Sequence, residues 1–592
     1  IPGTFICHTL YEINMIDYEY YSVLHLLEAH ALSKPDNVCL LYPNFKPQQP
    51  TTYASVTFKQ FNDMANNLAK ILSKNFNENE LKSNNNSIIV CLLASGNVQY
   101  LLTIYALLKL NIIVFPLSIR NSQPAIVHLI TKTNASYLLY SQQYSTIVND
   151  TIKELKGVKI ATLDDEIDIQ DLLVKNNNDD INLSIHKKED LERINVIYHR
   201  AFHYESVGGN IGLVAPGNSG STAFPKPIYL DNKRLLNPYY IYKNFNEDNY
   251  KPNDTLLSMA PFFYEYGFRM TFIMWQNKGI YALPLTRTVP PSPHDVLASI
   301  KSGKINIFGS APAALEQLID TIKVENNNDY SPLKQLRYIS FGGAPCPDEL
   351  CKNILDNGIE LRCEYGSTET GPCMFYDFES PLINTRLKRM RIPNIRKPYL
   401  TFIPESDDSN IKELVLLPND PFKASNISNR SDGSYTTNDL FIEDPPNSGY
   451  YIIQGRIDDT LIHTNGTKTN AIPIELTIRE HLIVKQVAVI GHDRFCTSAI
   501  IQLNIDEASK YQLNEIDKQV WMAIEAANRN SPKHSRILKE MYTILPMNKY
   551  LPVTDKGNIM RKKILVEYED IINDMYNKFL NNVDEHQQQS GT

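Results

Sequence analysis

The sequence has little cysteine and no long apolar run, and both absences limit what the protein can be. Its 8 cysteines are scattered over 592 residues, and none pairs with histidines at the spacing of a zinc site. We therefore expect reduced, mostly buried thiols, as in a cytoplasmic protein. No stretch reaches the roughly 18–20 apolar residues that a membrane helix needs. Residues 1–24 also lack the pattern of a secretory signal.

An excess of positive charge is missing too. Lys and Arg number 58 against 66 Asp and Glu, which gives a formal net charge of -8. This balance gives no support to nucleic-acid binding. A length of 592 residues allows more than one hydrophobic core. Because the chain begins at Ile1 rather than at a methionine, we expect it to be part of a longer protein.

Helical and strand-like patterns alternate along the first third of the chain. Phe58–Leu72 and Tyr100–Leu110 carry apolar residues at helical spacing, whereas Ser87–Leu93 and Ile112–Pro116 are short apolar runs typical of buried strands. Alternation of this kind favours an α/β fold with a parallel sheet covered by helices. A second unit of the same type is expected from about residue 256 to 375.

The composition changes at Asp444–Gly449, which reads Asp-Pro-Pro-Asn-Ser-Gly, and a charged turn follows at Gly455–Asp459. Beyond this turn we expect a compact unit of about 115 residues with a strand at Leu482–Gly491 and a helix at Lys518–Asn528. The polar residues Asn581–Thr592 show no core pattern.

The segment Asn218–Ile228 is the most informative in the chain. Its small and hydroxylated residues are followed by Lys226, which is fixed between two prolines. Small side chains let backbone N–H groups approach phosphate oxygens, hydroxyls add donors, and the lysine adds a positive charge. The segment differs from the standard P-loop. Taken alone, it could equally be an ordinary Ser/Gly turn.

Further motifs follow this loop in order. They comprise Pro261–Gly267, Phe341–Pro345, Glu364–Gly371, Tyr435–Leu440 and Gly455–Asp459. Glycines after a strand allow a flat ligand to approach the backbone, and a lone carboxylate beside phosphates suits Mg²⁺. Each motif by itself could instead be an aromatic core patch or a surface turn.

In this order the motifs resemble the adenylate-forming superfamily of acyl-CoA synthetases, luciferases and peptide-synthetase adenylation domains. The resemblance covers about residues 20–570. Residues 225–228 and 116–122 look most like the adenylation domains of fungal carboxylic acid reductases. The resemblance implies a large N-terminal domain at 1–455 with two helix-covered sheets. It also implies a small mobile α+β domain at 456–575, and a polar tail or linker at 576–592.

The resemblance also implies residue roles. The ATP- or AMP-binding residues would be Ser219, Gly220, Ser221, Thr222, Gly342, Gly343, Ala344, Tyr365, Gly366, Ser367, Asp439 and Arg456. The catalytic residues would be Lys226, Thr368, Glu369 and Lys556, with Glu369 also holding Mg²⁺. The acyl pocket would be lined by Tyr264, Phe268, Gly309 and Ser310, and the hinge would be Asp458.

Three positions depart from the family pattern. Asn558 stands where the C-terminal catalytic lysine of the family is expected, and Lys556 two positions earlier is the candidate to replace it, with Lys562 and Lys563 just beyond. Ala223 and Asn438 replace glycines, although asparagine tolerates left-handed backbone.

The resemblance implies ATP-dependent activation of a carboxylic acid to an acyl-adenylate. The acyl group would then pass to a phosphopantetheine thiol on a downstream carrier domain, with a reductase domain beyond it. Tyr264 stands where amino-acid-activating domains place an aspartate, so a plain carboxylic acid is favoured over an amino acid. One alternative is a free-standing acyl-CoA ligase that uses coenzyme A. Another is a non-catalytic module that only binds a nucleotide or acyl group.

Overall fold

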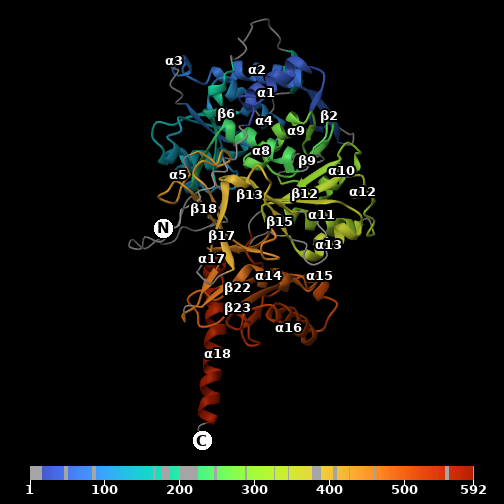
Figure 1. The fold of residues 1–592 in the computed structure, drawn as a ribbon, viewed down its shortest axis with the longest axis vertical. Helices are drawn as coiled ribbons and strands as arrows, with labels where there is room; N and C mark the ends of the chain where they lie inside the picture. The colour runs from blue at the N-terminus through green and yellow to red at the C-terminus, as the bar shows by residue number, and fades with distance from the viewer. Residues whose placement is uncertain are drawn as a thin grey trace, which may run out of the picture.

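The structure is a computed structural model that describes most of the chain. The described residues are 16–45, 51–82, 88–163, 169–174, 186–199, 225–245, 250–286, 288, 290–325, 327–344, 346–376, 389–404, 410–425, 427–457, 460–465, 467–553 and 559–590. They form an upper body built around two large sheets and a smaller lower body made by the C-terminal residues, from which a long helix projects (Figure 1).

Six strands in the order β6–β5–β3–β4–β7–β8 form the first sheet. They are β3 Ile89–Leu93, β4 Ile113–Pro116, β5 Tyr137–Ser141, β6 Lys159–Leu163, β7 Ile194–His199 and β8 Pro227–Asp231. All neighbours run parallel except β7 and β8. Because β8 begins directly after Lys226, this sheet holds the end of the predicted phosphate loop.

The second sheet has 13 strands and supplies most of the predicted site. Its order is β16–β17–β18–β19–β15–β14–β13–β12–β11–β9–β10–β1–β2. The strands from β13 through β12, β11, β9 and β10 to β1 are parallel, whereas β2 at one edge and the strands beyond β13 at the other are antiparallel to their neighbours. The strands are β1 Val38–Asn44, β2 Thr52–Thr57, β9 Thr255–Ser258, β10 Ile280–Ala282, β11 Ile307–Ser310, β12 Tyr338–Gly342, β13 Leu361–Ser367, β14 Gly371–Tyr376, β15 Met390–Arg391, β16 Leu400–Pro404, β17 Ile411–Leu416, β18 Tyr435–Glu443 and β19 Tyr450–Arg456.

Helices cover these sheets and begin where the sequence provides caps. The Thr57 hydroxyl accepts a hydrogen bond from the Gln60 amide, and the Gln60 side chain accepts one from the Thr57 amide, so a capping box starts α2. The helices of the upper body are α1 Val23–Ser33, α2 Phe58–Ser73, α3 Glu78–Lys82, α4 Val98–Lys109, α5 Gln123–Thr133, α6 Ser145–Glu154, α7 Ile169–Val174, α8 Asn232–Phe245, α9 Glu265–Gln276, α10 Pro293–Lys301, α11 Pro312–Glu325, α12 Ser331–Lys334 and α13 Asp348–Asp356.

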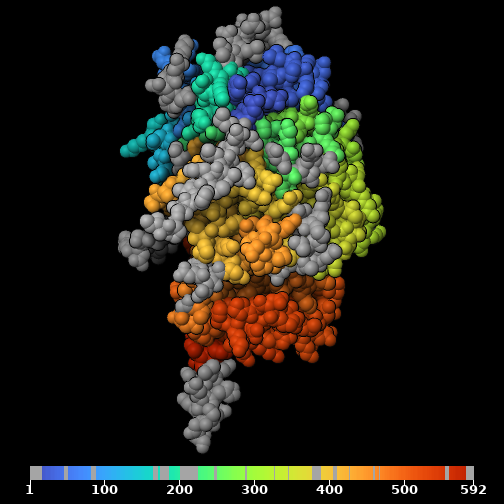
Figure 2. Space-filling view, in the orientation of Figure 1, coloured from blue at the N-terminus to red at the C-terminus, as the bar shows by residue number. Residues whose placement is uncertain are grey.

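The lower body has its own hydrophobic core, which includes Ile478, Val487, Ile500 and Val520, and Figure 2 shows it as a distinct block below the rest. Its strands are β20 Thr460–Ile462, β21 Lys468–Asn470, β22 Val484–Ile490, β23 Ser498–Leu503 and β24 Tyr542–Ile544. Its helices are α14 Ala471–Arg479, α15 Ile505–Ala508, α16 Leu513–Arg529, α17 Arg561–Glu567 and α18 Glu569–Ser590.

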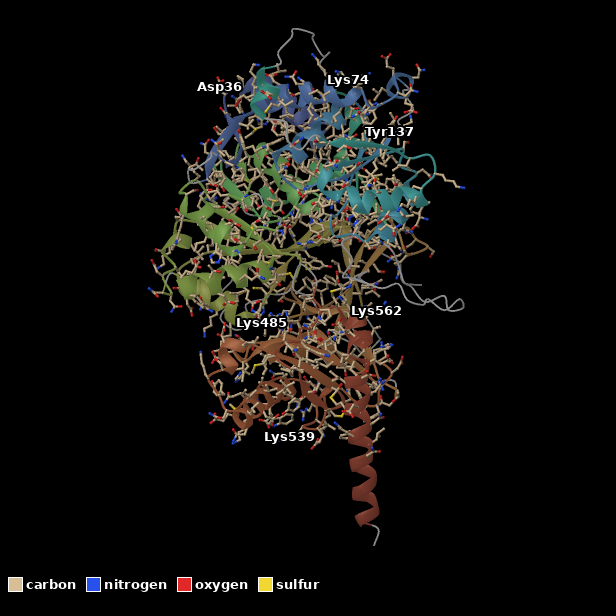
Figure 3. All side chains as sticks on the ribbon, turned by 180° about the vertical axis from the view of Figure 1, so that it is seen from behind. Asp36, Lys74, Tyr137, Lys485, Lys539 and Lys562 are labelled. Atoms are coloured by element: carbon tan, nitrogen blue, oxygen red, sulfur yellow. The ribbon has the colours of Figure 1, made fainter. Side chains whose placement is uncertain are left out.

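Among the described residues, two ion pairs join the bodies. Arg479 Nη2 lies 3.3 Å from Glu316 Oε2, and Lys485 Nζ lies 3.9 Å from Asp320 Oδ2. Both carboxylates come from α11. Figure 3 shows Lys485 and Lys562 at the level where the bodies meet, and Lys539 at the far end of the lower body.

The predicted helices and strands are confirmed with shifts of a few residues at their ends. Phe58–Leu72 is α2, Ser87–Leu93 contains β3, and Lys518–Asn528 lies within the longer α16. The α/β fold class is also confirmed. The boundary between residues 455 and 456 stays a prediction.

The polar tail or linker at 576–592 stays a prediction as a domain division, but its described part is helical. Helix α18 continues through it to Ser590, and Tyr576 is only 2% exposed because it packs into the lower core. The pattern was missed because the apolar residues of this segment are few and lie near its start.

Seven of the eight cysteines are described, and all seven are free thiols. Six of them are buried, as expected. Cys7 lies outside the described residues. Among the described helices none is both long and apolar enough to cross a membrane.

Candidate active site

A short turn between β13 and β14 carries the predicted catalytic residues Thr368 and Glu369. Three consecutive carbonyl oxygens of this turn accept hydrogen bonds from three different segments. Arg234 donates to Thr368 O at 3.0 Å, the Ala424 amide to Glu369 O at 2.8 Å, and Arg396 to Thr370 O at 3.3 Å. The turn is thus held in one orientation by three segments that are distant in the sequence.

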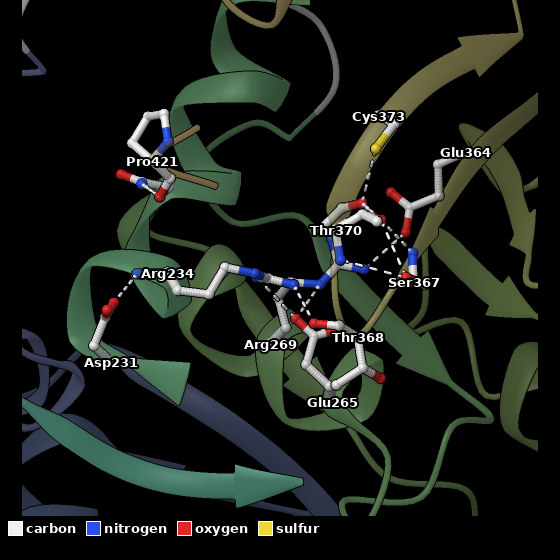
Figure 4. Close-up of polar contacts among 12 residues, drawn as sticks. Asp231, Arg234, Glu265, Arg269, Glu364, Ser367, Thr368, Thr370, Cys373 and Pro421 are labelled. Carbon is white, nitrogen blue, oxygen red and sulfur yellow. Dashed lines mark hydrogen bonds and ion pairs between the residues drawn. The ribbon is translucent and has the colours of Figure 1, made fainter. Parts of the chain in front are cut away.

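Arg234 belongs to a buried network of charges (Figure 4). Its guanidinium lies 3.4 Å from Glu265 Oε1, and the same oxygen lies 3.1 Å from Arg269 Nε. Arg269 also donates to Glu364 at 2.9 Å. All of these side chains are 10% exposed or less. A buried charge is tolerated when partners neutralise it, so the alternating signs explain how four such groups coexist.

A second pair, between Arg396 and Asp420, supports the other end of the turn. Their side chains are completely buried and 2.8 Å apart. Burial raises the pKa of Asp420, although Arg396 opposes this shift. The Arg396 guanidinium also lies over the Phe422 ring, 4.5 Å from its centroid.

Three residues predicted to bind the nucleoside lie together at the junction of β13, β18 and β19. The Tyr365 hydroxyl donates to one carboxylate oxygen of Asp439, and Arg456 Nη1 donates to the other at 2.9 Å. Asp439 and Arg456 are each 13% exposed, so both remain accessible. Burial raises the pKa of Tyr365, and the phenol is therefore kept protonated.

The backbone beside these groups has the geometry that the motifs predict. Gly343 has a φ of 81°, and Asn438 has a φ of 62°, a left-handed conformation that asparagine tolerates. A Cβ atom on Gly342 would lie 2.9 Å from the carbonyl oxygen of Glu364, and one on Gly366 would lie 2.3 Å from that of Gly371. Only glycine fits these last two positions.

The predicted acyl-pocket residues are not equally accessible. Tyr264 is part-exposed at the start of α9, and burial raises its pKa. Ser310 is 7% exposed at the end of β11, beside Gly309. Phe268, in contrast, has no exposed surface and packs among Tyr105 and Phe272 in the main core. In this structure Phe268 therefore supports the pocket region without reaching its surface.

The structure brings together only part of the predicted site. Lys226 is exposed immediately before β8, and Ser367, Gly343 and Ala344 lie at strand ends on the same side of the second sheet. The predicted residues Ser219, Gly220, Ser221, Thr222, Asp458 and Lys556 lie outside the described residues.

The described residues on either side of 554–558 contact each other. Val553 and Ile559 form an isolated antiparallel bridge, and the Met560 amide donates to Pro552 O at 2.9 Å. Arg561 then donates to Glu475 at 2.6 Å. The two flanks are thus paired with each other, and Arg561 joins the second flank to α14.

Sequence reasoning missed Arg234, Arg269, Arg396 and Asp420. The spacing of Glu265 and Arg269, four residues apart in an otherwise apolar helix, was the signal available for one pair. The other partners are far apart in the sequence and carried no local signal.

Comparison with sequence families then decides the assignment. The model described as "AMP-binding enzyme" matches residues 27–395, and the model described as "AMP-binding enzyme C-terminal domain" matches residues 458–580. The chain belongs to the AMP-binding enzyme family. It is thus an adenylate-forming enzyme of the AMP-forming ligase type.

Curated relatives in this family include adenylate-forming reductase Nps10 of Heterobasidion annosum, which is 26% identical over 482 residues, or 78% of this chain and 41% of the relative. A carboxylic acid reductase of Neurospora crassa is 24% identical over 530 residues, or 82% of this chain and 44% of the relative. The chain therefore spans less than half the length of these relatives.

Solved structures of AMP-binding enzymes share the fold. The anthranilate CoA ligase AuaEII with anthranoyl-AMP matches 93% of this chain and 97% of its own, with a TM-score of 0.70 at 17% identity. The o-succinylbenzoate CoA synthetase of Bacillus subtilis with ATP and magnesium matches 91% and 98%, with a TM-score of 0.66 at 16% identity.

The site of this AMP-binding enzyme fits a magnesium ion that arrives with a nucleotide. No cluster of three metal-ligating side chains exists within the described ranges. The one carboxylate predicted as a ligand, Glu369, lies in the anchored turn. Mg²⁺ in phosphate-binding sites uses one or two carboxylates and completes its shell with phosphate oxygens and water, so a single glutamate is adequate.

Proposed function

We propose that this chain activates a carboxylic acid with ATP, forming an acyl-adenylate and pyrophosphate. It then transfers the acyl group to the phosphopantetheine thiol of a carrier domain, as the adenylation part of a carboxylic acid reductase-like protein. The observation that carries the proposal is the convergence of two groups of residues at one end of β13. One is the Tyr365–Asp439–Arg456 cluster, and the other is the turn of Thr368 and Glu369.

Each group would bind a different part of the nucleotide. Asp439 would accept hydrogen bonds from the ribose hydroxyls, with Arg456 holding its carboxylate in place, and Tyr365 would stack on adenine. Thr368 would contact the α-phosphate, and Glu369 would hold Mg²⁺, which neutralises charge on the phosphates when bound. The role of the structure is to position these groups before the nucleotide arrives.

The substrate would be a plain carboxylic acid. Tyr264 cannot pair with an ammonium group. Glu265 beside it is 4% exposed and already engaged by Arg234 and Arg269. Neither residue is thus suited to recognising the amino group of an α-amino acid.

The first test is carboxylate-dependent ATP–pyrophosphate exchange on the purified chain with aromatic, short aliphatic, fatty and amino acids. Exchange with one class of acid is expected, and Lys226→Ala and Lys556→Ala should both lower it. Nucleotide binding without exchange for every acid would contradict the proposal and favour a non-catalytic module.

The thiol acceptor needs a second test. The chain is incubated with ATP and its best acid, together with either a phosphopantetheinylated carrier domain or coenzyme A. Faster acylation of the carrier is expected. Faster formation of acyl-CoA would identify an acyl-CoA ligase instead, while leaving the adenylation step intact.

A further inference from the structure

A polar cluster lies at the carboxyl ends of neighbouring parallel strands, next to the predicted acyl pocket. In β11, Gly309 pairs with Ser340 of β12, and Gly342 at the end of β12 pairs with Glu364 of β13. A Cβ atom on Gly309 would lie 3.6 Å from the Tyr266 hydroxyl, and one on Gly342 would lie 3.3 Å from Glu364 Cγ. Ligands of open α/β sheets bind at this edge, so Tyr266 and Glu364 flank the place where an acyl group would end.

The cluster consists of Tyr242, Tyr266, Arg269 and Glu364. The Arg269 guanidinium lies 5.1 Å from the centroid of the Tyr266 ring, and donates to the Tyr242 hydroxyl at 2.8 Å and to Glu364 at 2.9 Å. The Tyr242 hydroxyl donates to the second oxygen of Glu364. Arg269 and Tyr242 are buried, whereas Tyr266 and Glu364 are part-exposed. Tyr266 and Glu364 are therefore the less buried members of the cluster, although the Glu364 side chain is only 10% exposed.

Glu364 retains capacity for a further hydrogen bond. A carboxylate offers about four lone-pair positions, and Arg269 and Tyr242 each occupy one. Because Arg269 also balances the charge of Glu364, a neutral hydroxyl donor suits the remaining positions better than an ammonium group. An apolar group placed here would remove water from Glu364 and Tyr266 without replacing the hydrogen bonds that the water makes to them.

We propose that this cluster ends the acyl pocket and selects short carboxylic acids that carry a hydroxyl group at the end remote from the carboxyl group. The inference rests on the proposed function and names its substrate class. Behind Arg269 lies a second buried ion pair, between Glu265 and Arg234. A long apolar chain that reached this cluster would remove the remaining water from Glu364 and Tyr266 without supplying a hydrogen bond, so fatty acids are excluded.

The test compares matched acids in the pyrophosphate-exchange reaction of the full chain. The pairs are 4-hydroxybenzoate with benzoate and 6-hydroxyhexanoate with hexanoate, and palmitate is the long-chain probe. In at least one pair, kcat/KM is expected to be about ten- to a hundredfold higher for the hydroxy acid, as for a hydrogen bond to a charged group. Palmitate should give no exchange.

Two variants locate the effect. Glu364→Gln keeps the shape of the side chain but not its charge, and Tyr266→Phe removes one hydroxyl. Both should reduce the preference for the hydroxy acid, measured as the ratio of its kcat/KM to that of the unsubstituted acid, about tenfold. Tyr338→Phe removes a buried hydroxyl from the opposite end of β12 and should leave the preference unchanged.

The outcomes separate the two proposals. Equal or faster exchange with unsubstituted acids, or exchange with palmitate, would overturn the hydroxy-acid inference and leave adenylation in place. An unchanged preference in Tyr266→Phe and Glu364→Gln would also overturn it, and if Glu364→Gln does not fold, Tyr266→Phe decides alone. Absence of exchange with every acid, including the amino acids, would overturn both proposals.

Discussion

The Arg234 guanidinium donates a 3.0 Å hydrogen bond to the carbonyl oxygen of Thr368, 134 residues further along the sequence. Arg234 stands near the start of α8, directly after the strand that follows Lys226. The contact therefore connects the end of the predicted phosphate loop to the turn that carries Glu369. One buried side chain fixes the relative position of two predicted parts of the nucleotide site.

Arg234→Met is expected to lower the free energy of unfolding by about 3 kcal/mol, because it leaves Glu265 with one cationic partner and Thr368 O without its donor. Urea denaturation measures this. Lys233→Met is the matched control, because its ion pair with Glu192 is exposed and should contribute less than about 1 kcal/mol. Equal losses in the two variants would contradict the role given to Arg234.

Asp439→Asn is expected to weaken ATP binding at least about tenfold. The variant removes the charge that holds Arg456 and replaces a carboxylate oxygen that would accept a ribose hydroxyl. Isothermal titration of ATP against the purified chain measures the change. Asp432→Asn, an exposed change in the turn before β18, should leave the affinity unaltered. Unchanged affinity in Asp439→Asn would exclude its proposed contact.

Gly366→Ala is expected to destabilise the protein by more than about 2 kcal/mol. The added Cβ would lie 2.3 Å from the Gly371 carbonyl oxygen, and this backbone cannot move without disturbing the turn at residues 368–370. Gly96→Ala is the control, because its Cβ would meet neighbours only at 3.5 Å or beyond. Thermal unfolding of both variants should separate them clearly.

The stability of the chain should decrease as the pH falls from about 6.5 to about 4. Burial, with a smaller effect from Lys34, lowers the pKa of His30 to about 4, whereas the unfolded residue titrates near 6.5. Between these pH values the unfolded state binds more protons than the folded state, so the free energy of unfolding decreases as the pH is lowered. His30→Gln should reduce the slope of the free energy of unfolding against pH by an amount that corresponds to at most about one bound proton. An unchanged slope would show that His30 is accessible to protons in the folded chain.

The ion pair between Arg479 and Glu316 should contribute about 0.5–1 kcal/mol to holding the two bodies together, because both side chains are only partly buried. A double-mutant cycle with Arg479→Ala and Glu316→Ala in thermal unfolding measures this coupling. It should decrease as salt is raised from 0.05 to about 0.5 M. A coupling that does not respond to salt would contradict an electrostatic contact.

Several features of the chain were predictable because they depend on neighbours in the sequence. Apolar spacing located α2 and α4, and short apolar runs located β3 and β4. The residue type of Asn438 also permits the left-handed backbone that the structure shows there. The order of the motifs indicated the family, which the matches to residues 27–395 and 458–580 confirm.

The end of the chain shows where local patterns failed. Residues 576–590 are helical although their composition is polar, because Tyr576 and the residues before it pack into the lower core and the helix continues from there. Composition gives only the average polarity of a segment, whereas a helix needs only one apolar stripe that packs against a hydrophobic core.

The sequence by itself determined the type of several elements, including α2, α4, β3 and β4, the order of the motifs and thus the family of the enzyme. Only the tertiary structure decided that Arg234, Glu265, Arg269 and Glu364 form one buried network. It also decided that Phe268 lies in the core while Tyr266 is part-exposed. The physical reason is that buried charges are stable only beside opposite charges. The chain brings those partners together across about 130 residues by packing α8, α9 and β13 side by side.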